Sequence, residues 1–125
     1  MKNIKLLILD DDYDVRLNLQ IYFEDEDIDC SAYEDSVTAL SEFSNSEFEV
    51  GIVDLRLPVM NGEEFILEAH KLNPQTKFLI YTGSSDYKLS KELIDIGMTQ
   101  NDVYHKPIKS MDIFVKKIKE LSTSL

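Results

Sequence analysis

The chain has 125 residues, of which 43% are hydrophobic, and a formal net charge of −11. This length fits one domain, residues 1–125, with enough apolar content for a core, and the acidic charge argues against direct nucleic-acid binding. The single cysteine, Cys30, excludes an internal disulfide and is predicted to be a core thiol in a reducing compartment. The sequence has no signal-peptide pattern and no apolar run of about 20 residues, so we expect a cytoplasmic protein without a membrane segment.

Five apolar runs of strand length are spaced along the chain, and a segment with helical periodicity follows each of them. The runs are Ile4–Leu9, Ile28–Ala32, Val50–Val53, Phe78–Tyr81 and the residues around Val103–Tyr104. The helical segments carry apolar residues three or four apart: Val15, Leu19, Tyr22 and Phe23; Val37, Leu40 and Phe43; Phe65, Ala69 and Leu72; Leu89, Leu93 and Ile96; Met111, Phe114, Ile118 and Leu121. This alternation predicts one doubly wound α/β domain, with a five-stranded parallel sheet covered by helices on both faces.

A few small or polar residues predict where two of the helices begin or end and where one strand lies in the sheet. Asp12 or Asp14 is expected to cap the first helix, and Gly97 is expected to end the fourth. In the second run, Asp29 and Ser31 alternate with apolar residues, so we expect this strand at an edge of the sheet.

Charged and polar side chains stand where four of the strands end. Asp10 and Asp11 follow the first run, Asp54 the third, Thr82 the fourth and Lys106 the fifth. Because ligands of an open α/β sheet bind outside the carboxyl ends of its strands, we expect these residues to converge on one site.

The residue types indicate the chemistry of that site. Three neighbouring carboxylates repel one another, and an all-oxygen ligand set favours Mg²⁺ as their counterion. Asp54 could then act as a nucleophile toward a phosphoryl donor and form an aspartyl phosphate. Lys106 would neutralise charge on the transferred group, and the Thr82 hydroxyl could donate a hydrogen bond to it.

Four motifs in this order resemble the receiver domain of bacterial two-component response regulators, of which the chemotaxis regulator is a single-domain example. The resemblance covers essentially the whole chain and rests on Leu9-Asp10-Asp11-Asp12, Val53-Asp54-Leu55-Arg56-Leu57-Pro58-Val59-Met60-Asn61-Gly62, Tyr81-Thr82-Gly83 and His105-Lys106-Pro107-Ile108. It implies a flavodoxin-like strand order 2-1-3-4-5 and phosphoryl acceptance from a sensor histidine kinase or a phosphotransfer protein. It also implies that the face made by the fourth helix, fifth strand and fifth helix carries the signal to an output domain or target protein, with a homodimer as a further form.

The resemblance also implies individual roles. Asp10, Asp11, Asp54 and the main-chain carbonyl of Arg56 would hold Mg²⁺. Asp54, Thr82 and Lys106 would carry the phosphoryl chemistry, and a cis peptide would precede Pro107.

One feature departs from the family pattern. Many receivers carry a switching aromatic residue three positions before the lysine, where this chain has Val103, with Tyr104 next to it. The segment 97–102 is also longer than the usual link, so Thr82, Val103 and Tyr104 are the candidates for the switch. We further expect Arg56 and Ser84, which flank the site, to tune hydrolysis of the aspartyl phosphate.

Other interpretations are open for these motifs. Taken alone, Asp10 to Asp12 could simply cap a helix, and Lys106 could be a surface lysine. A turnover phosphatase or phosphotransferase resembling the haloacid dehalogenase group would need a second aspartate at the position of Arg56, so we do not expect an enzyme with an external substrate. A phosphorylation-independent interaction domain with the receiver fold is the remaining alternative.

Overall fold

The computed structural model describes residues 3–123, which form five strands, five α-helices and one short 3-10 helix. In chain order these are β1 (Ile4–Leu9), α1 (Tyr13–Asp25), β2 (Ile28–Tyr33), α2 (Ser36–Phe43), β3 (Val50–Val53), α3 (Gly62–Leu72), β4 (Lys77–Thr82), α4 (Lys91–Asp95), η1 (Gln100–Asp102), β5 (Val103–His105) and α5 (Met111–Thr123). No helix within these residues is long and apolar enough to cross a bilayer.

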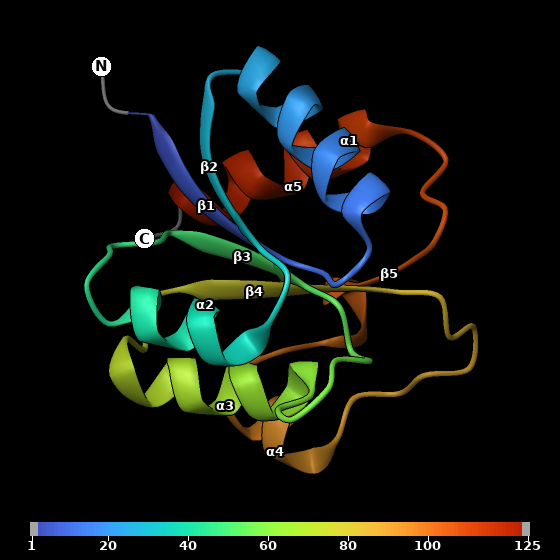
Figure 1. Cartoon of the computed structure of the whole chain (residues 1–125). Helices are drawn as coiled ribbons and strands as arrows, with labels where there is room; N and C mark the ends of the chain where they lie inside the picture. The colour runs from blue at the N-terminus through green and yellow to red at the C-terminus, as the bar shows by residue number, and fades with distance from the viewer. Residues whose placement is uncertain (1–2, 124–125) are drawn as a thin grey trace.

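The strands form one parallel sheet in the order β2-β1-β3-β4-β5. Figure 1 shows α1 and α5 on one face of this sheet and α2, α3 and α4 on the other. The predicted doubly wound, flavodoxin-like fold is therefore confirmed, and β2 lies at an edge as expected. The strand order reverses between β1 and β3, which is where such folds place their ligands.

Helices α1, α2 and α3 each begin at a side chain that satisfies a free backbone N–H group. Asp12 caps α1 by accepting hydrogen bonds from the backbone nitrogens of Asp14 and Val15. Asp35 caps α2 in the same way. At α3, Asn61 and Glu64 form a reciprocal capping box. Helix α3 therefore starts at a fixed point, at Gly62, nine residues after β3 ends at Val53.

Three details of the predicted helices were wrong. Val37 and Leu72 are each 53% exposed, because α2 and α3 bury other residues, including Ala39 and Ile66. Leu89 lies before α4, since the hydroxyl of Ser90 caps that helix and leaves it only five residues long. The prediction that Gly97 ends the fourth helix is confirmed. Gly97 follows the C-cap residue of α4 and has φ of +106°, in the left-handed region that glycine adopts without strain.

A core lies on each side of the sheet. Phe43, Phe65 and Phe78 pack together on the side of α2 and α3. On the side of α1 and α5, Phe114 is fully buried and contacts aromatic rings of α1, β4 and β5. Cys30 belongs to this second core, and burial is the main cause that raises the pKa of its thiol to about 12, so the predicted core thiol is confirmed.

The loop after β3 contains a β-branched residue in a conformation that such residues avoid. Val59 has φ of +69°, and the backbone nitrogen of Met60 donates to the carbonyl of Pro58, which closes a γ-turn around Val59. Its side chain is 91% exposed, so no packing compensates for the strain. The turn is therefore held by its surroundings and not by the preference of Val59 itself.

We expect Val59→Asn to raise the free energy of unfolding by about 1 kcal/mol, because asparagine tolerates the left-handed region better than valine. Urea unfolding measures the change. Val37→Asn is the matched control, since Val37 is an exposed helical residue and valine and asparagine have similar helix propensities. A Val59→Asn domain that is no more stable than the wild type would contradict the assignment of strain to this turn.

Candidate functional site

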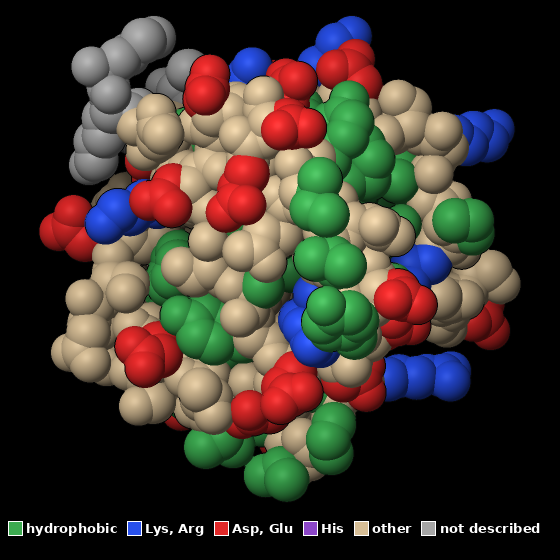
Figure 2. Space-filling model, turned by 45° about the horizontal axis from the view of Figure 1, so that its top comes forward, with side chains coloured by type: hydrophobic (Ala, Val, Ile, Leu, Met, Phe, Trp, Pro, Cys, Tyr) green, Lys and Arg blue, Asp and Glu red, His purple; other side chains and the backbone are tan. Residues whose placement is uncertain are grey.

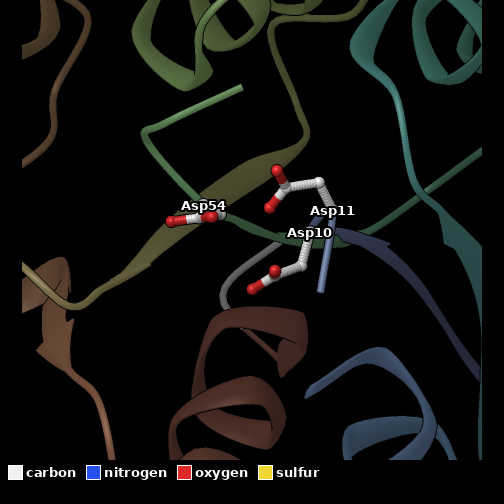
Figure 3. Close-up of side chains that lie close together, drawn as sticks. All are labelled: Asp10, Asp11 and Asp54. Carbon is white, nitrogen blue, oxygen red and sulfur yellow. The ribbon is translucent and has the colours of Figure 1, made fainter. Parts of the chain in front are cut away.

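The acidic residues after β1 and β3 come together because these two strands are neighbours. Leu9 pairs with Val53 in the parallel register, and the backbone nitrogen of Asp54 donates to the carbonyl of Leu9 at 2.8 Å. Carboxylate oxygens of Asp10, Asp11 and Asp54 all lie within 4.8 Å of one another. Figure 3 shows the three side chains reaching toward the same side of the sheet edge.

Lys106 reaches this acidic group from β5. Its backbone nitrogen donates to the carbonyl of Thr82, which continues the pairing of β5 with β4, and the peptide bond to Pro107 is cis. The Lys106 ammonium lies 2.8 Å from Oδ2 of Asp10 and 3.6 Å from Oδ2 of Asp54. Burial would lower the pKa of Lys106, but hydrogen bonding and charge attraction from Asp10, with further attraction from Asp54, raise it overall. The lysine therefore stands as a cation between the two buried carboxylates.

The surroundings of the Asp54 carboxyl group disfavour its charged form. Burial is the largest cause that raises its pKa above the usual 3.8, and the charge of Asp10 adds to it. Lys106 and a hydrogen bond from the backbone nitrogen of Leu55 act in the opposite direction without reversing the shift. An additional cation nearby would stabilise the charged form of this carboxylate. Such a group suits both metal binding and reaction with an electrophile.

We expect Asp54→Asn to raise the free energy of unfolding of the metal-free domain by about 1 kcal/mol at neutral pH, because it removes one of three repelling charges. Since the folded-state pKa of Asp54 is raised, the wild type gains stability as pH falls through that pKa toward 3.8, and the difference between the two proteins shrinks there. Unfolding in the presence of a chelator, as a function of pH, measures both effects.

The control for this prediction is Asp29→Asn, an exposed aspartate near the amino end of β2, where it pairs with Lys5 at the end of β1 opposite to the site. It should change stability by less than about 0.5 kcal/mol. An Asp54→Asn domain that is less stable than the wild type at pH 7 would show that Lys106 already compensates the acidic group fully.

A hollow of about 350 Å³ opens beside these side chains. It is lined by Asp11, Asp54, Arg56, Thr82, Gly83, Ser84 and Lys106. The Thr82 side chain is buried, and its Oγ1 accepts a hydrogen bond from the backbone nitrogen of Ser84 at 3.1 Å. Four of the five residues that were predicted to converge, Asp11, Asp54, Thr82 and Lys106, thus border one space, together with Arg56 and Ser84. Asp10 does not line this space but contacts Lys106.

The donor set fits a hard divalent cation. Three carboxylates offer oxygen ligands within 4.8 Å of one another, and Asp11 is exposed, so the group opens to solvent. Mg²⁺ prefers such oxygen ligands and keeps several waters of its own, for which the open side leaves room.

The two switch candidates near β5 differ in burial. Val103 is 9% exposed and belongs to the core under α3, whereas Tyr104 is half-buried with its ring 5.0 Å from that of Phe114. A rotamer switch at either residue, like the role of Thr82, stays a prediction.

Two residues that position the site were missed from the sequence, and a third, Gly62, was noted only as part of the motif after Asp54. Arg16 of α1 donates to the carbonyl of Asp10 at 2.9 Å, and the buried Ser36 donates to the carbonyl of Met60 at 2.6 Å. A Cβ atom on Gly62 would lie 2.1 Å from the carbonyl oxygen of Asp54. Only Gly62 left a signal in the sequence, because a glycine at the first turn of a helix is unfavourable unless the space is needed.

Comparison with known proteins agrees with this geometry. Residues 6–119 match the family model of the response regulator receiver domain. The chain is 28% identical over 107 residues to the transcriptional regulatory protein FlgR of Helicobacter pylori, an alignment that covers 85% of this chain and 26% of that protein. The chain thus spans about a quarter of the length of that relative.

Solved structures show the same fold. A CheY-like response regulator receiver domain protein from Methanospirillum hungatei has a TM-score of 0.83 and 26% identity, with 99% of this chain and 100% of that chain covered. The response regulator TrrA from Thermotoga maritima, solved in complex with Mg²⁺ and BeF, has a TM-score of 0.80 and 22% identity, with 94% and 98% covered. The chain belongs to the receiver domain family of two-component response regulators, whose members are regulatory domains and not conventional enzymes.

Proposed function

We propose that this receiver domain accepts a phosphoryl group on Asp54 from the phosphohistidine of a sensor histidine kinase or a phosphotransfer protein, with Mg²⁺ as the required ion. The observation that carries the proposal is the position of Lys106, whose ammonium lies 3.6 Å from Asp54 and 2.8 Å from Asp10 beside the hollow that Asp11 and Asp54 also line. A lone surface carboxylate would not need this partner.

In the proposed reaction, a carboxylate oxygen of Asp54 attacks phosphorus while the bond from phosphorus to the donor's imidazole nitrogen breaks. The imidazole takes the electron pair, and Asp54 becomes an acyl phosphate. The Lys106 ammonium would then stabilise the negative charge of the transferred phosphoryl group, and the Thr82 hydroxyl would donate a hydrogen bond to a phosphoryl oxygen. Water later attacks the phosphorus, which returns the Asp54 carboxylate and releases phosphate.

The proposed metal ligands are Asp10, Asp11, Asp54 and the main-chain carbonyl of Arg56. When bound, Mg²⁺ would neutralise charge on the phosphoryl oxygens. Its binding would also offset the burial of Asp54 and the charge of Asp10, which in that order raise the pKa of Asp54. TrrA, which shares the fold, was solved in complex with Mg²⁺ and BeF, and this supports Mg²⁺ binding by the present domain without identifying its ligands.

The proposed consequence of phosphorylation is a change at the face formed by α4, β5 and α5, which would bind an output domain or a target protein. To move such a switch from 1:99 to 99:1, the phosphoryl group must favour the active state by about 5.5 kcal/mol. We place the domain in the cytoplasm, where a reduced Cys30 would be stable.

The phosphodonor needs a protein surface beside the site, and α1 offers one. Tyr13, Leu17 and Ile21 stand four residues apart along α1 and are 63%, 37% and 53% exposed. Figure 2 turns the side of α1 toward the viewer and shows hydrophobic side chains in a band among acidic ones. We assign this band to contact with the donor protein.

The test is Mg²⁺-dependent binding of beryllofluoride, a mimic of the phosphoryl group, followed by ¹⁹F NMR. We expect one bound group per chain with Mg²⁺, none without it, and none in Asp54→Ala. Failure to bind in the presence of Mg²⁺ would instead favour a phosphorylation-independent interaction domain.

A further inference from the structure

The side chain of Gln100 holds the loop that follows Thr82. Its Nε2 donates to the carbonyl of Tyr87 at 3.2 Å, and its Oε1 accepts from the backbone nitrogen of Leu89 at 3.3 Å. One amide thus bridges the backbone of the segment between β4 and α4 from a position 11 to 13 residues away. Both hydrogen bonds need the amide group, because they use it once as donor and once as acceptor.

Gln100 itself stands on a rigid support. It is the first residue of η1, in which the Asp102 carboxylate accepts from the backbone nitrogen of Thr99 at 2.9 Å. The other oxygen of Asp102 lies 3.7 Å from the ammonium of Lys117 on α5, and the Asp102 side chain is only 15% exposed. The segment 97–102 is therefore joined to α5 by this ion pair and can hold the loop from outside.

The loop that Gln100 contacts forms one wall of the hollow beside Asp54, which is called the phosphoryl hollow below. Thr82, Gly83 and Ser84 line that space. Within the loop, the backbone nitrogen of Ser84 donates a hydrogen bond to Oγ1 of Thr82, and its hydroxyl donates one to the carboxylate of Asp86. Both hydrogen bonds are local to the loop. Tyr87 packs against the core under α3. Leu89 packs there as well, and the side-chain amide of Gln100 adds two hydrogen bonds to the backbone of these two residues.

We propose that Gln100 is a positioning residue for phosphoryl acceptance, which keeps the wall formed by Thr82 and Ser84 in place before the phosphoryl group arrives. A site that is already ordered loses less conformational freedom on binding. The metal ligands come from β1 and β3, so the metal itself does not depend on this loop. This inference rests on the proposed function of Asp54.

The test compares Gln100→Ala with the wild type in two titrations: Mg²⁺ alone, and beryllofluoride at saturating Mg²⁺. We expect Gln100→Ala to weaken beryllofluoride binding about three- to tenfold, the range open to two exposed hydrogen bonds, and to leave Mg²⁺ binding unchanged. Hydrogen exchange at the Leu89 amide should accelerate in the same variant.

Two further variants separate positioning from general damage. Gln100→Glu keeps the acceptor for Leu89 but loses the donor to Tyr87, so we expect a smaller loss than in Gln100→Ala. Asn101→Ala changes the exposed neighbour and should bind beryllofluoride like the wild type.

Equal or tighter beryllofluoride binding by Gln100→Ala would overturn the inference and leave the proposed function intact. A parallel loss of Mg²⁺ affinity would also overturn it, because the effect would then be general. A wild-type domain that binds no beryllofluoride would overturn the proposed function, and this inference with it.

Discussion

Gly62→Ala is expected to lower the free energy of unfolding by about 3 kcal/mol or more, among the largest effects of a single substitution in this domain. The added Cβ would lie 2.1 Å from the carbonyl oxygen of Asp54 and 2.9 Å from Cα of Leu55. Both neighbours are backbone atoms, and the backbone nitrogen of Gly62 donates a hydrogen bond to the carbonyl of Leu55 at 2.9 Å. Neither segment can therefore move apart without losing backbone structure. The clash falls on the residue that we assign as the phosphoacceptor.

Urea unfolding of Gly62→Ala against Gly83→Ala measures this effect. Gly83 is the matched control, because a Cβ there would meet nothing within 4 Å. Any Gly62→Ala protein that remains folded should also accept a phosphoryl group more slowly, since the start of the loop after β3 must shift. Equal stability of the two alanine variants would show that the loop is more adaptable than the contact implies.

Lys106→Met is expected to slow phosphoryl acceptance by about 100-fold or more, because it removes the cation that would follow charge onto the phosphoryl group. The methionine side chain keeps most of the apolar stem but loses the ammonium, which lies 5.6 Å from the centroid of the Tyr81 ring. It leaves Asp10 and Asp54 without their ammonium partner, so Mg²⁺ binding should persist or strengthen while the reaction slows. The rate of mass gain with acetyl phosphate at saturating Mg²⁺ measures the effect.

Lys109→Met serves as the control, since Lys109 is exposed and does not line the hollow beside Asp54. It should react at the wild-type rate. If Lys106→Met reacted within threefold of the wild type, the role of Lys106 in the reaction would be wrong, and its contact with Asp10 would be structural.

Much of the fold followed from local sequence patterns. The runs Ile4–Leu9 and Val50–Val53 form strands with those bounds, because buried parallel strands need continuous apolar sequence. Asp10, Asp54 and Lys106 could be placed in one site from topology alone, since each follows a strand of the same parallel sheet.

Other features depend on contacts that no local pattern contains. The length of α4 could not be read from Leu89, because Ser90 supplies the cap and places Leu89 outside the helix. The bridge from Gln100 to Tyr87 requires η1 and the loop after β4 to be side by side, which only the assembled sheet produces. Arg16 is similar, since its bond to the carbonyl of Asp10 depends on how α1 lies against the sheet edge.

The domain thus combines three neighbouring carboxylates, a lysine between two of them that are buried and a loop whose backbone accepts from and donates to the Gln100 amide. The measurement that tests the central claim most directly is the intact mass after incubation with acetyl phosphate, with and without Mg²⁺, for the wild type and Asp54→Ala. We predict a gain of one phosphoryl group in the wild type with Mg²⁺ and no gain in the other three conditions. No gain in any condition, or an equal gain in Asp54→Ala, would contradict the assignment of Asp54 as the phosphoacceptor.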